Sequence, residues 1–98
     1  MLMVVDTESG KEIARVQSVG DTDDLFYDAQ HRRIYIVGGE GFLTVVAQED
    51  ANHYTPVATI PTASGARTAL FVPELRRLYL AVPRRGTQGA EIRVYEVQ

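Results

Sequence analysis

The acidic residues of one short turn are the first candidates for chemistry in this sequence. The candidate metal ligands are carboxylates that follow Gly20 or lie in a second glycine-rich turn: Asp21, Asp23, Asp24 and Glu40. Carboxylate oxygens are the ligands that Ca²⁺ and Mg²⁺ prefer. The spacing is neither that of an EF-hand nor that of an RTX repeat, and Asp residues in turns commonly hydrogen-bond their own backbone. We predict no cofactor, and Ca²⁺ is the one candidate ion.

Arginine side chains supply the second candidate site. The residues that would bind an anion lie just before a predicted strand and in a later loop: Arg67, Thr68, Arg84 and Arg85. Guanidinium groups that converge there would bind a carboxylate or a phosphate. The alternative is an ion pair of Arg67 with an acid of a neighbouring unit, such as Asp23 or Asp24, with the other two arginines solvated.

The sequence offers no catalytic constellation beside these two sites. His31 and His53 each lie in a turn and have no partner at the spacing of a metal site or a catalytic dyad. Ser64 has alanine where the nucleophile elbow needs both outer glycines. The chain contains no cysteine, which excludes thiol catalysis, disulfides and cysteine-bound zinc.

The elements that must position these residues form a repeat. Residues 32–35 (Arg-Arg-Ile-Tyr) recur as residues 76–79 (Arg-Arg-Leu-Tyr), and self-similarity at such a period is the signature of a repeat architecture. Each copy has an apolar run, a turn, the arginine pair, an alternating strand, a glycine-bearing turn and a further strand. Because the arginine pairs recur in register, a structural role is favoured for them.

The pattern predicts about nine strands in units of four antiparallel strands, which is the organisation of β-propeller blades. Residues 1–18 form the third and fourth strands of a preceding blade, and residues 23–61 form the first full blade. Residues 67–97 form a second blade that lacks its outermost strand. The predicted fold class is therefore an all-β partial β-propeller with an extra N-terminal hairpin. No window has the apolar spacing of an amphipathic helix over three turns.

Three phrases of the sequence resemble a known family. Residues 6–11 (Asp-Thr-Glu-Ser-Gly-Lys) and the two strands that begin with the arginine pairs resemble the YVTN-type repeat of seven-bladed, WD-like β-propellers. The resemblance covers nearly the whole chain and departs from the pattern at residues 47–52. It implies a propeller fold, and it implies relatives among lactonases and amine-dehydrogenase-like heavy chains. A periplasmic or extracellular location would agree with such relatives.

A ring of about four to eight blades is needed to cover every blade face, so two and a half blades do not suffice. We therefore expect other blades as partners. They come from the rest of a longer chain, of which this is a C-terminal segment, or from two or three further copies of this chain. The strand at residues 92–97 lacks an outer neighbour. Residues 12–16 would suit that place, but they already form a hairpin with residues 2–5.

The charge of the chain bounds its partners. A net charge of −3 is too small to indicate nucleic acid or a membrane surface, and neither is predicted as a partner. Residues 1–49 have a net charge of −5 and residues 50–98 one of +2, which favours head-to-tail contact between units unless it arises by chance. Apolar runs are of strand length, and we find no signal peptide, so the compartment stays open.

These observations lead to three hypotheses of function. The first is a non-enzymatic β-propeller segment that acts as a binding scaffold through its loop face, for a protein or a small anionic ligand. The second is part of a propeller enzyme, lactonase-like or amine-dehydrogenase-like, with a ligand or metal site at the channel mouth. The third is a purely structural pair of blades that assembles into a ring.

Overall fold

The computed structural model describes residues 2–18, 20 and 22–97, and strands are the main regular structure of these residues. The strands are β1 (Leu2–Val5), β2 (Glu12–Val16), β3 (Thr22–Asp28), β4 (Arg33–Gly38), β5 (Phe42–Asp50), β6 (His53–Pro61), β7 (Thr68–Val72), β8 (Arg77–Val82) and β9 (Glu91–Glu96). One 3₁₀ turn, η1 (Pro73–Leu75), joins β7 to β8. The prediction of an all-β chain with about nine strands is confirmed. No helix in the described part of the chain has the length and hydropathy needed to cross a membrane.

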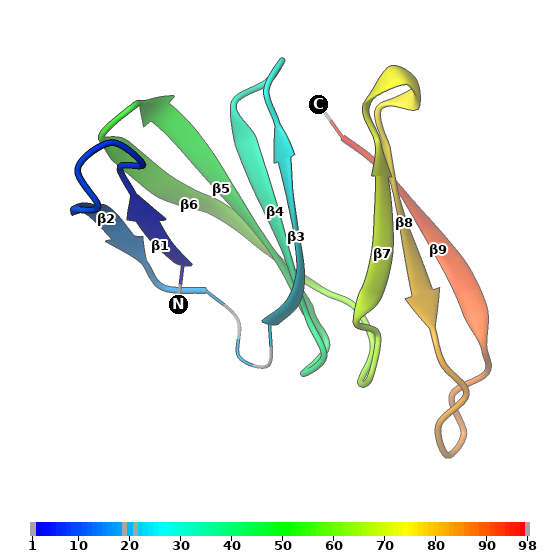
Figure 1. Cartoon of the computed structure of the whole chain (residues 1–98). Coiled ribbons are helices and arrows are strands. Elements are labelled where there is room, and N and C mark those ends of the chain that lie inside the picture. Colours follow the sequence, from blue (N-terminus) through cyan, green and yellow to red (C-terminus); the bar gives the residue numbers. More distant parts are fainter. Residues whose placement is uncertain (1, 19, 21, 98) are drawn as a thin grey trace.

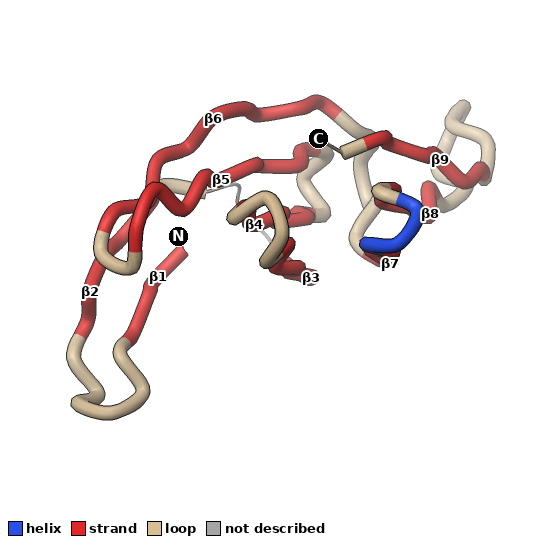
Figure 2. Tube along the Cα trace, turned by 90° about the horizontal axis from the view of Figure 1, so that it is seen from above, coloured by secondary structure: helices blue, strands red, loops and turns tan. Residues whose placement is uncertain are grey.

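The strands form three antiparallel sheets, in which each strand pairs with its neighbours in sequence. Sheet A has the order β1-β2, sheet B the order β3-β4-β5-β6, and sheet C the order β7-β8-β9. The sheets lie side by side in this order (Figures 1 and 2). Strand β2 lies against β6, and β3 lies against β7, so strands at equivalent positions of the repeat face each other. Tyr35 and Tyr79, the repeated tyrosines, lie in the separate sheets B and C.

The central strands of sheet B, β4 and β5, are buried on both faces because they alternate apolar side chains between the two neighbouring sheets. We call the face towards sheet C its front face and the face towards sheet A its rear face. Tyr35 and Val37 of β4 belong to the core shared with Leu78 and Leu80 of sheet C. The residues between them, Ile34 and Ile36, belong to the core shared with Leu2 and Val16 of sheet A. The period of two along a strand thus makes β4 apolar throughout.

The turn before the second strand of each unit has the same backbone geometry in both copies. Arg32 and Arg76 are left-handed, with φ of 53° and 52°. The Arg32 carbonyl accepts a hydrogen bond from Gln48 N–H at 2.8 Å, and the Arg76 carbonyl accepts one from Val97 N–H at 2.9 Å. The repeated arginine pair therefore marks the turn between the first and second strands of a unit. A backbone hydrogen bond joins this turn to the end of the third strand. This geometry gives the pair a structural role.

A buried carboxylate closes the first of these turns. Asp28 is 4% exposed, and its Oδ1 accepts hydrogen bonds from the N–H groups of Gln30 (3.2 Å) and His31 (3.3 Å). Its Oδ2 lies 2.8 Å from Nδ1 of His31. Because the carboxylate has three close partners, its burial needs no external ligand.

The link between the second and third strands differs in length between the two units. Three residues, 39–41, separate β4 from β5, and eight residues, 83–90, separate β8 from β9. The longer link folds on itself through reciprocal backbone hydrogen bonds between Arg85 and Gln88, both of 2.9 Å. The strand pairing that follows is unaffected, because Arg33 lies opposite Ala47 and Arg77 lies opposite Glu96.

Candidate functional site

The structure separates the acids of the candidate metal site. Strand β3 begins at Thr22, which pairs with Gly38, so Asp23 and Asp24 lie in a strand and the expectation of a loop there is corrected. Asp24 Oδ2 accepts a hydrogen bond from Ala69 N–H at 3.3 Å, across the boundary between sheets B and C. The Glu40 carboxylate lies against Gly20, where an added Cβ would approach Glu40 Oε1 to 2.5 Å.

Asp21 lies outside the described residues. Among the described residues, no three side chains of Asp, Glu or His gather in a way that would hold a metal ion. The metal site with Asp21, Asp23, Asp24 and Glu40 stays a prediction.

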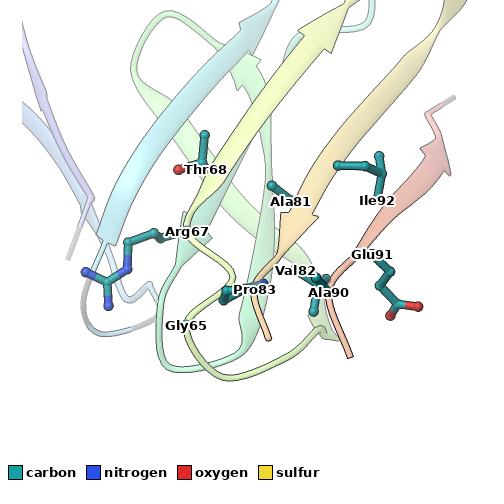
Figure 3. A pocket seen from close by; sticks show the side chains of 9 residues that line it. All are labelled: Gly65, Arg67, Thr68, Ala81, Val82, Pro83, Ala90, Glu91 and Ile92. Carbon is teal, nitrogen blue, oxygen red and sulfur yellow. The ribbon is translucent and has the colours of Figure 1, made fainter. Parts of the chain in front are cut away.

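Arg67, directly before β7, has the repeat position of Asp23, and the two form an ion pair, with 3.8 Å from Nε to Oδ2. The Arg67 side chain reaches towards β3, away from Ile92 and Glu91 (Figure 3). This is the alternative that the sequence left open for Arg67.

The other predicted anion-binding residues do not all meet at one place. Thr68 and Arg67 line a cavity of about 540 Å³ at the loop end of sheet C, whereas Arg84 and Arg85 do not line it. The Arg85 guanidinium lies against Gly65, where an added Cβ would be 2.9 Å from Nη1. Both Arg84 and Arg85 are exposed. Convergence of the three arginines on an anion stays a prediction.

The front face of sheet C is apolar and uncovered. Register places Leu70, Tyr79 and Val94 in one row across the three strands, with Ala81 and Ile92 in the next row towards the loops. Leu70 is 59% exposed, Ile92 is 64% exposed and Val94 is 50% exposed. The rear face of the same sheet packs on sheet B through Leu78, Leu80 and Val82. Sheet C is thus apolar on both faces, of which only one is covered.

A second uncovered apolar area lies on the rear face of β3. Leu25 is 48% exposed and Tyr27 is 50% exposed, although their neighbours in register, Ile36 and Ile34, are buried. Within the described residues, sheet A consists of β1 and β2, and β2 lies against β6 at the far side of sheet B. No strand of sheet A therefore stands opposite β3.

A groove of about 610 Å³ lies between the end of β9 and the front face of β5 and β6. Apolar side chains line it, among them Leu43, Val57, Ile60 and Val94, and the ring of Tyr35 lies beside them. Tyr35 is 3% exposed, and its hydroxyl has no hydrogen-bond partner among the described residues. Burial raises the pKa of Tyr35 above its ordinary value of 10.0; the nearby Asp28 adds to this rise, and Arg33 opposes it.

Comparison of the chain with models of known protein families, with curated proteins and with solved structures finds no match.

The uncovered front face of sheet C was not predicted from the sequence, although a signal was present. Residues 69–72 are a continuous apolar run, which is typical of a strand covered on both faces.

Proposed function

We propose that the chain is a β-propeller segment that acts as a protein-interaction scaffold, and that its binding surface is the front face of sheet C. One observation carries the proposal, namely that sheet C is apolar on both faces and covered on one. Uncovered apolar patches of this kind mark surfaces for protein partners. Burying the exposed half of Leu70, Ile92 and Val94 would contribute roughly 1 kcal/mol each at ordinary transfer values.

The partner that fits this surface is the rear face of another sheet of the same kind. Within the chain, the front face of sheet B already packs on the rear face of sheet C, and equivalent strands face each other. Leu25 and Tyr27 offer an uncovered rear face on β3. Front-to-rear stacking of further units would repeat the existing contact, and the opposite net charges of the two halves of the sequence favour the same direction.

The geometry supports this scaffold better than the enzyme alternative. A metal-dependent reaction at the loop face would need its carboxylates free to converge. Asp23 instead pairs with Arg67, and Asp24 bonds the backbone of β7. Both acids thereby hold sheet B to sheet C within the chain, so they serve packing between the sheets.

The test is the mass of the chain in solution, measured by light scattering at several concentrations. We expect the unaltered chain to form multimers and Leu70→Glu to shift it to monomers, because the charge would have to be buried in the contact. Leu75→Glu is the matched control, since Leu75 is a leucine of similar exposure (56%) in η1. The proposal would be refuted if the unaltered chain stays monomeric at high micromolar concentration. It would also be refuted if the Leu70→Glu variant has the same mass in solution as the unaltered chain.

A further inference from the structure

Strand β9 has an unpaired edge whose hydrogen-bonding groups can be assigned. Among the described residues it pairs with β8 alone. Val97 N–H bonds to the Arg76 carbonyl, and Arg77 stands opposite Glu96, so bonding to β8 continues through Tyr95 and Arg93 in alternation. The N–H and C=O groups of Ile92 and Val94 consequently point to the free edge. Such an edge is a template for an added strand.

The groove beside this edge is shaped for a strand in the fourth position of sheet C. In sheet B, β6 fills the fourth position next to β5. The described part of the chain places no strand there in sheet C, and the groove between β9 and β6 continues the core shared by the two sheets.

Strand β2 has the sequence and position of a fourth strand. It matches β6 at a separation of 44 residues, with Ile13 for Val57 and Val16 for Ile60, and it packs against β6. Leu43 lies opposite Ile60 in sheet B. If β2 pairs with β9 in the way that β6 pairs with β5, Val16 lies opposite Ile92. The present partner of β2 is β1, which has only four residues and a register shift between Val4 and Val5.

We propose that β9 of one copy of the chain pairs with β2 of a second copy and displaces β1 from it. Sheet C then gains its fourth strand, and β9 offers six residues where β1 offers four. The exchange also brings the front face of sheet C onto the rear face of β3 in the second copy, over Leu25 and Tyr27. This inference rests on the proposed scaffold function and specifies how two copies join.

The experiment uses cysteine pairs in the full chain, which has no cysteine of its own. The single variants Val16→Cys and Ile92→Cys are mixed and oxidised, and products are separated under denaturing, non-reducing conditions. We expect a mixed disulfide, because opposed residues of paired strands have Cα separations that a disulfide spans. Leu70→Cys mixed with Val16→Cys is the matched control, since Leu70 lies on the same face of sheet C but two strands away from β9.

A second variant addresses the edge directly. Val94→Pro removes an N–H that points outwards and leaves the bonds to β8 in place, so the yield of the mixed disulfide falls by about fivefold, as for one lost hydrogen bond. Equal yields from the Ile92 and Leu70 pairs would overturn the strand exchange. If multimers still form and still depend on Leu70, the scaffold proposal stands without it. A monomeric unaltered chain would overturn both.

Discussion

Replacing Tyr35 by phenylalanine is expected to stabilise the chain. The Tyr35 ring is 3% exposed and lies 5.4 Å from the ring of Phe71, measured between centroids, at an interplanar angle of 46°. Phenylalanine keeps this ring and its contacts. Only the hydroxyl is removed, and that hydroxyl is buried without a hydrogen-bond partner among the described residues.

The expected gain follows from the cost of the buried hydroxyl. An unsatisfied buried polar group costs about 1–3 kcal/mol, so Tyr35→Phe should raise the free energy of unfolding by that amount. For a chain of 98 residues, each 1 kcal/mol raises Tm by about 4–8 °C. Tyr79→Phe is the matched control, because Tyr79 occupies the equivalent strand position in sheet C but is only half-buried. Its effect should stay within about 0.5 kcal/mol.

The pH dependence supplies a second readout of the same residue. Burial raises the pKa of Tyr35 in the folded state above its ordinary value of 10.0. The folded state therefore holds this proton more tightly than the unfolded state. The resulting stability is complete below pH 10.0 and is lost as the pH rises through the raised folded pKa. Tyr35→Phe lacks this loss, so its advantage over the unaltered chain should widen above pH 10.0.

Urea unfolding at fixed chain concentration measures both effects, since association would otherwise shift the midpoint. A Tyr35→Phe variant that is less stable than the unaltered chain at neutral pH would refute the reasoning. It would mean that the hydroxyl makes a favourable hydrogen bond in the folded chain.

Two further substitutions test the repeated turns. Asp28→Ala should lower the free energy of unfolding by about 2–3 kcal/mol, because the N–H groups of Gln30 and His31 lose a charged acceptor that is itself buried. Asp50→Ala removes a similar but exposed contact with Asn52 and His53 and should cost much less in the same urea titration. Arg76→Gly should raise the free energy of unfolding by about 0.5–1 kcal/mol, because the strain relieved at a φ of 52° exceeds the backbone entropy that glycine loses on folding. Arg77→Gly, in the adjacent strand, should lower the free energy of unfolding. A destabilised Arg76→Gly variant would show that the arginine side chain itself holds the turn.

The strands could be predicted from the sequence because each is encoded locally. The recurrence of the arginine pair and the alternation after it identify β4 and β8, and turn glycines separate them from β5 and β9. The partner of Arg67 was harder to assign, because Asp23 is 44 residues away and comes near only when sheets B and C stack. The Tyr35 hydroxyl, for which the described residues offer no partner, has no sequence signal at all, since its surroundings depend on which side chains pack around the ring. The apolar run at residues 69–72 indicates a strand that is apolar on both faces, but which face stays uncovered depends on how many strands the neighbouring sheet has.

The link between β8 and β9 shows where this molecule accommodates extra sequence. Its eight residues replace the three between β4 and β5, and Gly86, with φ of 59°, forms its outer bend. Doubling the length of a flexible loop costs only about 0.6 kcal/mol. A short epitope or fluorophore-binding peptide inserted after Gly86 would therefore be displayed at the tip of sheet C, and it would label the protein without disturbing the pairing of either flanking strand.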